Sequence, residues 1–82
     1  GIKIYPNPTK NDFTIEIESI SALNETVNIE VYDNLGRTIR IGSISKDGSG
    51  KTKVSLNGYV TGTYFIKCFN NSFEKHFKVV KL

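Results

Sequence analysis

The sequence contains no methionine and no tryptophan and a single alanine, whereas isoleucine, valine, phenylalanine and tyrosine supply most of its apolar side chains. Apolar residues that favour helices are therefore scarce, and β-branched and aromatic residues favour strands. No stretch of about ten residues places apolar side chains at the spacing of an amphipathic helix. These absences predict an all-β protein.

Residues that carry chemistry are also scarce, because the chain has one cysteine, Cys68, and one histidine, His76. A single cysteine excludes an internal disulfide, and the two residues cannot form a structural zinc site. Cys68 lies in an apolar stretch, where a free cysteine usually packs as a small hydrophobic residue. His76 is expected on a solvated strand face, and the glycines are scattered over turns instead of forming a phosphate-binding loop. We predict no catalytic residue, no metal and no cofactor.

No apolar run in these 82 residues is long enough to cross a membrane, and no signal peptide is recognised, so membrane insertion is not expected. The net charge is +3, and lysines concentrate near the end, at Lys75, Lys78 and Lys81. Basic residues do not alternate with exposed aromatic residues and no recognition helix is visible, so nucleic acid is not an expected partner. The lysines are expected to give solubility and to protect an edge strand, with a binding patch as the alternative.

What the sequence does contain is a series of short stretches in which apolar and polar residues alternate, as in half-buried strands. They recur about every ten residues, with turn-forming residues between them, which is typical of a β-sandwich. The predicted strands are 2–5, 13–18, 26–33, 37–44, 51–56, 63–69 and 73–80. The strand at 63–69 is predicted to be central and buried on much of both faces. Residues 19–25 are predicted to be a polar connection, and Gly36 is expected to take a positive φ in a compact hairpin loop.

Two prolines flank Asn7 in the stretch "YPNPT". Neither Pro6 nor Pro8 can donate a backbone hydrogen bond, so the stretch cannot lie within a helix or a central strand. We predict a short edge strand before it and a stiff corner that carries the chain from one sheet to the other.

The larger aromatic side chains cannot all fit inside so small a core; they are Tyr5, Tyr32, Tyr59, Phe65 and Phe69. In one interpretation they pack across strands and their hydroxyl groups anchor corners of the fold. In the other, exposed rings form the binding face of an accessory carbohydrate-binding or adhesion module. The absence of tryptophan favours the first interpretation.

Three stretches, in this order and at these distances, resemble the type A C-terminal sorting domain of the bacterial type IX secretion system. They are "IYPNPTKNDFTIEI" at 4–17, "IEVYDNLGRTIR" at 29–40 and "GTYFIKCFNNSFEKHFKVVK" at 62–81. The residues that match the family motifs are Pro6, Asn7, Pro8, Tyr32, Asp33, Leu35, Gly36, Arg37, Gly62 and Tyr64. The residues that correspond to the basic, apolar tail on which secretion depends, and that would therefore bind the partner, are Lys75, Lys78, Val79, Val80 and Lys81.

The resemblance implies a non-catalytic address label, a single domain over 1–82 excised from the C-terminus of a larger secreted cargo of Bacteroidota. Its partners would be the type IX translocon, a sortase-like surface peptidase and the cargo domain that precedes it in the same chain. The protein would pass through the periplasm and finish at the cell surface or in the medium. Family members of known structure are seven-stranded immunoglobulin-like sandwiches, in agreement with the strands predicted above.

The last strand is a suitable label if it lies at the edge of a sheet. Its free backbone groups could then pair with a partner strand, while its lysines discourage random pairing and favour an acidic receptor. Exposed edges would also allow a weak dimer. Besides the carbohydrate-binding module, a spacer of fibronectin type is an alternative from a different functional class.

Overall fold

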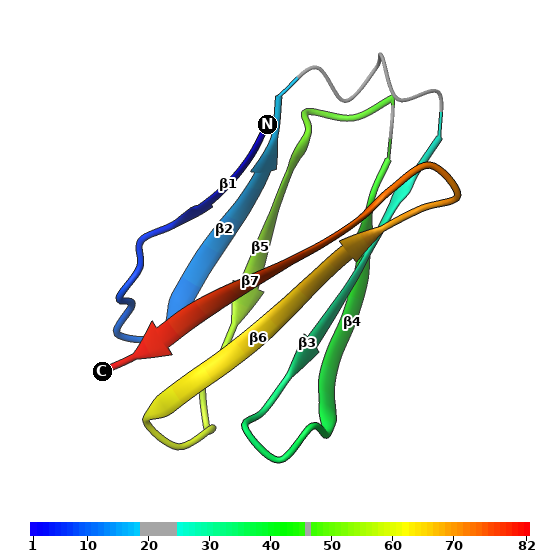
Figure 1. Cartoon of the computed structure of the whole chain (residues 1–82). Coiled ribbons are helices and arrows are strands. Elements are labelled where there is room, and N and C mark those ends of the chain that lie inside the picture. Colours follow the sequence, from blue (N-terminus) through cyan, green and yellow to red (C-terminus); the bar gives the residue numbers. More distant parts are fainter. Residues whose placement is uncertain (19–24, 46) are drawn as a thin grey trace.

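The computed structural model describes residues 1–18, 25–45 and 47–82, and these form seven strands in two antiparallel sheets that pack face to face (Figure 1). The small sheet has the order β1-β2-β5 and the large sheet the order β4-β3-β6-β7. The strands are β1 (Ile2–Tyr5), β2 (Asp12–Ile17), β3 (Val27–Tyr32), β4 (Thr38–Ile44), β5 (Lys51–Ser55), β6 (Gly62–Phe69) and β7 (Glu74–Lys81). The predicted all-β sandwich is confirmed, whereas the predicted connection at 19–25 falls largely outside the described residues.

The core lies between the sheets and follows from the alternation in the sequence. Every second residue of β2 and of β3 is buried, and β6 contributes three more buried side chains. Each fully buried aliphatic or aromatic side chain stabilises the fold by roughly 1.5–3 kcal/mol. The buried apolar residues are Phe13, Ile15, Ile17, Val27, Ile29, Val31, Ile44, Val54, Leu56, Tyr64, Ile66, Cys68 and Val79.

The predictions for Cys68 and His76 are confirmed. Cys68 is fully buried, and its burial raises the pKa of the thiol to about 11, so that it packs as an apolar group. His76 lies on an exposed strand face. The prediction that the strand at 63–69 is central is confirmed, but burial on much of both faces is confirmed only in part, because the outward residues are at most half-buried and Phe65 is 39% exposed. A sandwich covers only the inner side of each strand, even when the strand is central in its sheet.

The hairpin between β3 and β4 confirms the predicted loop. Gly36 has φ 82°, its N–H donates to the carbonyl of Asp33 at 3.1 Å, and the N–H of Asp33 donates to the carbonyl of Arg37 at 2.9 Å. The Asp33 carboxylate accepts hydrogen bonds from the backbone of Leu35 and Arg37 and lies 2.7 Å from the Arg37 guanidinium. Burial acts to raise the pKa of Asp33, but these bonds outweigh it, so the pKa lies below its ordinary value. These motif residues, Asp33, Leu35, Gly36 and Arg37, therefore stabilise the turn between β3 and β4.

Gly62 and Tyr64, two further residues that match the family motifs, also have structural roles. Gly62 begins β6 with φ 143°, a backbone conformation that favours glycine. Tyr64 is buried, and its hydroxyl donates to the carbonyl of Val60 in the turn just before the strand. This bond is the tyrosine corner found in immunoglobulin-like sandwiches. A tyrosine hydroxyl thus anchors a corner of this fold, at a residue outside the set for which such anchoring was predicted.

Candidate functional site

The alternation along β7 separates the residues predicted to bind a partner into two groups. Val79 faces the core and is completely buried. Lys81 faces the same way, and its ammonium donates to the carbonyls of Leu56, at 3.0 Å, and Tyr59. Both residues therefore have contacts within the fold that hold the end of β7 in place.

The remaining three predicted residues are exposed or partly exposed, but on different sides of the strand. Lys75 lies on the inner side of β7, as Val79 does, but it is exposed at the edge of the core, beside Phe73. Lys78 and Val80 point outward from the large sheet, and Val80 is 39% exposed. Only Lys78 and Val80 thus present side chains together on one face.

β7 is an edge strand, which is the condition under which the sequence made it a suitable label, but the C-terminal half of its edge is not free. The side-chain amide of Asn7 donates to the carbonyl of Lys78 at 2.8 Å, and its oxygen accepts from the N–H of Val80 at 3.0 Å. Thr9 continues the pairing in a parallel sense, since its N–H donates to Val80 at 2.9 Å and its carbonyl accepts from Leu82 at 2.8 Å. We call these contacts the Asn7–Thr9 clasp.

The clasp corrects one prediction about the proline-flanked corner. The strands that the corner joins, β1 and β2, are neighbours in the small sheet, so the prediction that it connects two sheets is wrong. Between them the chain reaches over to the large sheet and bonds β7 (Figure 1). Pro6 and Pro8 leave the side chain of Asn7 as the group that pairs with the edge of β7.

The outer side of the large sheet carries a mixture of aromatic, apolar and basic side chains. Phe65 lies in register with Tyr32 of β3 on one side and with Lys78 of β7 on the other. Lys67, the next outward residue of β6, lies within 4.0 Å of carboxylate oxygens of Glu30 and Glu74. Lys78 has no carboxylate within this distance in the part of the chain that the structure describes.

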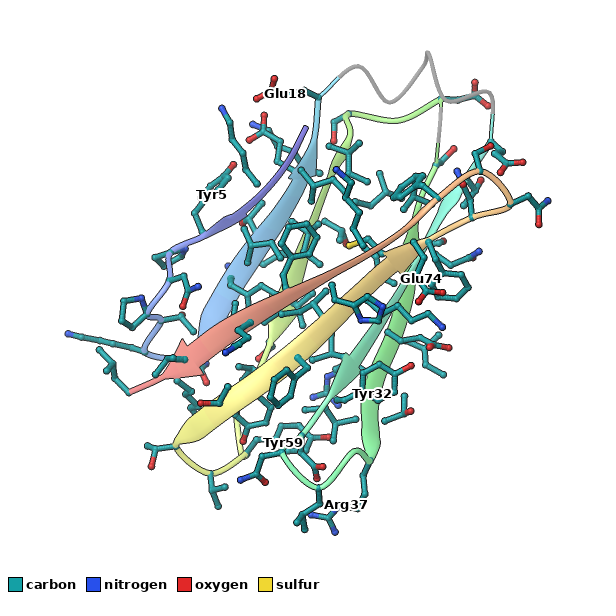
Figure 2. The ribbon with its side chains drawn as sticks, viewed as in Figure 1. Tyr5, Glu18, Tyr32, Arg37, Tyr59 and Glu74 are labelled. Atoms are coloured by element: carbon teal, nitrogen blue, oxygen red, sulfur yellow. The ribbon has the colours of Figure 1, made fainter. Side chains whose placement is uncertain are left out.

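A hollow of about 480 Å³ lies on the same face, bounded by Tyr32, Phe65 and His76 and by the β3–β4 turn. Figure 2 shows Tyr32 and Glu74 on this sheet, well away from Tyr5 and Glu18 beside the small sheet. His76 lies 2.8 Å from Glu74, and this hydrogen bond, with the nearby Lys67, lowers the pKa of the Glu74 carboxyl.

The outer side of the small sheet differs, because most of its charged groups are paired with one another; Lys51 is the exception, with no carboxylate oxygen within 4.0 Å of its ammonium among the described residues. Lys3 lies 2.8 Å from Glu18, and this hydrogen bond raises the pKa of Lys3 and lowers that of Glu18. Lys53 lies 3.4 Å from Asp12. The hydroxyl of Tyr5 donates to Glu16 at 2.7 Å, and this hydrogen bond raises the pKa of the tyrosine.

The aromatic residues bear on the alternative of a carbohydrate-binding face, which needs a row of open rings. On the large sheet Tyr32 donates its hydroxyl to Glu30, and the ammonium of Lys67 lies 4.4 Å from the centre of the Phe69 ring. Phe65 is left as the open ring of this group. Tyr32 and Phe69 are engaged by contacts within their own strands, β3 and β6, so these two contacts favour a structural role for the rings without showing cross-strand packing.

Two contributions were missed in the sequence. Asn7 was interpreted as part of a corner, although an asparagine between two prolines is a polar group without backbone donors on either side. Phe65 was counted among aromatic residues too numerous for the core, and the signal that separates it from Tyr64 and Ile66 is the alternation along the strand.

Within the described residues we find no helix long and apolar enough to cross a membrane. The same residues hold no cluster of three or more histidine, cysteine or carboxylate side chains that could bind a metal ion.

Comparison with curated proteins finds no match. The family model described as the secretion system C-terminal sorting domain matches residues 3–81. The match includes Asn7 and Thr9 of the clasp, the β3–β4 turn, the tyrosine corner and all of β7. The chain therefore belongs to the family of C-terminal sorting domains of the type IX secretion system.

Proposed function

We propose that this domain directs a cargo protein, attached before it in the same chain, across the outer membrane through the type IX translocon. The observation that carries the proposal is the family match over residues 3–81, which supports a type IX sorting signal and implies export to the cell surface or the medium. The family is one of sorting signals and is not catalytic.

The finer steps of the proposal follow the resemblance described above. The cargo passes through the periplasm, the folded domain is recognised there, and a sortase-like surface peptidase removes it after export. The cargo is then released or attached to the cell surface. No residue of this domain needs to react in any of these steps, which is compatible with the raised pKa of the buried Cys68 thiol.

The β7 strand is the element that we propose the machinery reads. Its inward residues, such as Val79 and Lys81, hold the strand in the fold. Its outward residues, such as Lys78 and Val80, are available to a partner without any change in the sandwich. The proposal is supported by this separation between inward residues of β7, which stabilise the fold, and outward residues, which are open to a partner.

A reporter fusion tests the proposal. A fluorescent protein with an N-terminal export signal is joined to the complete 82-residue chain and expressed in a bacterium with a type IX secretion system. We expect the reporter in the medium or on the cell surface when the domain is present, and in the periplasm when it is absent. Equal distribution of the two reporters would overturn the proposed function.

Deletion of Val79–Leu82 is a poor test, because Val79 is a core residue and the N–H of Leu82 donates to the carbonyl of Thr9 in the clasp. Such a deletion would remove recognition and stability together. Substitutions at Lys78 and Val80 separate the two effects, since neither side chain is buried.

A further inference from the structure

We infer that the outer side of β6 and β7 carries a docking site for a protein surface that presents a carboxylate bordered by apolar side chains. The site, here called the outer patch, consists of Tyr32, Phe65, Lys78 and Val80. This inference rests on the proposed function and specifies where the sorting machinery binds and with what chemistry.

Charge is the first argument. The ammonium of Lys67 lies 4.0 Å from Glu30 and 3.7 Å from Glu74, so its charge is balanced within the fold. Lys78 lies on the same face without a carboxylate within that distance among the described residues, and its register neighbour is the apolar ring of Phe65. A carboxylate of a partner would complete this environment, and its pairing would be strengthened by the apolar surroundings.

Apolar exposure is the second argument. Phe65 and Val80 are each 39% exposed; Phe65 is the neighbour of Lys78 across the strand pair, and Val80 is the next outward residue along β7. The hollow of about 480 Å³ beside Tyr32 and Phe65 offers room for a side chain of the partner. Aromatic residues are enriched at interfaces, and binding hot spots lie in well-packed pockets, so the ring of Phe65 beside the hollow is suited to a protein contact.

The edge of β7 is a less suitable site for the same partner. The clasp already occupies the carbonyl of Lys78 and both backbone groups of Val80. A partner strand would have to displace Asn7 and Thr9 to pair along the C-terminal half of β7, whereas docking on the outer patch breaks no bond. The backbone pairing expected from the sequence is thus limited to the part of β7 that precedes the clasp.

The reporter fusion described above, carrying single substitutions, tests the inference. Lys78→Glu, Lys78→Gln and Phe65→Ser each change the outer patch and leave the core untouched. We expect Lys78→Glu to lower the exported fraction at least about tenfold, which corresponds to the loss of one charged contact at an interface. Lys78→Gln should lower it less, because it removes a charge without adding a repulsive one. The matched control is Lys51→Glu, an exposed lysine on the outer side of the small sheet.

A melting curve of each purified domain accompanies the export assay, and the three lysine variants are expected to melt within a few degrees of the unchanged domain. Phe65→Ser is expected to melt lower, because Phe65 is only 39% exposed. The inference is overturned, and the proposed function stands, if the unchanged fusion is exported and Lys78→Glu, Lys78→Gln and Phe65→Ser are exported equally well. It is also overturned if Lys51→Glu lowers export as much as Lys78→Glu. If the unchanged fusion itself is not exported, the proposed function fails and the inference with it.

Discussion

The two outer faces of the sandwich are built from the same alternation, yet they differ in how their polar groups are satisfied. On the small sheet, Lys3 pairs with Glu18 and Lys53 pairs with Asp12. The hydroxyl of Tyr5 donates a hydrogen bond to Glu16. On the large sheet the pairing is confined to one end, around Lys67 and Glu74. The other end presents the outer patch.

The difference shows where this fold leaves interactions unused. A charge that is already paired within the fold has little to gain from a partner, because each new contact would replace an existing one. A lysine between exposed apolar side chains gains a contact without losing another. Lys51, the lysine of the small sheet without a carboxylate partner among the described residues, lies in register with Glu16, whereas Lys78 lies in register with Phe65. This difference supports the outer patch as the proposed docking site.

The largest effect on stability is expected when two neighbouring residues of β7 that face opposite ways are each replaced by alanine and compared. Val79→Ala removes buried methyl groups and should lower the free energy of unfolding by about 2 kcal/mol, whereas Val80→Ala should change it by no more than about 0.5 kcal/mol. Urea denaturation of the two variants measures both values. Equal destabilisation by both substitutions would contradict the separation of a core side from a docking side.

A smaller effect is expected when the clasp is removed. Asn7→Ala eliminates the two side-chain bonds to Lys78 and Val80, and we expect a loss of about 1 kcal/mol, because the bonds are solvent-accessible. The amide hydrogens of Val80 and Leu82 should exchange faster in this variant, while those of β2 keep their protection. Unchanged exchange at Val80 would mean that the clasp does not hold the edge of β7 in solution.

A still smaller effect is expected on the small sheet. Lys53→Gln breaks the ion pair with Asp12, and since Lys53 is largely exposed and Asp12 partly exposed, the free energy of unfolding should change by less than about 0.5 kcal/mol. Export of the reporter fusion should be unchanged. A clear loss of export with this variant would show that the small sheet is also recognised, and the contrast between the faces would fail.

The smallest effect is a local titration. The pKa of Glu74 is lowered first by its hydrogen bond with His76 and then by the charge of Lys67, so His76→Ala should raise it towards the ordinary value of 4.5. Because the folded pKa is depressed, any stabilisation from this pair is present above pH 4.5 and is lost as the pH falls through the folded value. Carboxyl chemical shifts followed by NMR should show the change at Glu74 and none at Glu18. No change at Glu74 would exclude the histidine as the cause.

Much of the fold could be predicted from local patterns. The strands follow from alternation, the loop at Gly36 from its turn residues, and the inert Cys68 from its apolar neighbours. These features depend on residues close together in the chain, where periodicity and turn chemistry act directly.

The candidate site was harder to predict, because it depends on contacts between distant parts of the chain. Asn7 meets Lys78 and Val80 across more than 70 residues, and nothing local to "YPNPT" indicates that partner. Lys81 looks like part of a basic tail until the fold brings the carbonyl of Leu56 to its ammonium. Alternation placed Lys78 and Lys75 on opposite sides of β7, so lysine spacing alone could not define a patch.

The most direct test of the account compares two matched triple variants of the reporter fusion. The outer-patch variant carries Phe65→Ser, Lys78→Glu and Val80→Asp, and the small-sheet variant carries Tyr5→Ser, Lys51→Glu and Lys53→Glu. We predict that the outer-patch variant stays in the periplasm, with its exported fraction lowered at least about tenfold, while the small-sheet variant is exported like the unchanged fusion. Equal export of the two folded variants would contradict the claim that the sorting signal is read from the outer face of the large sheet.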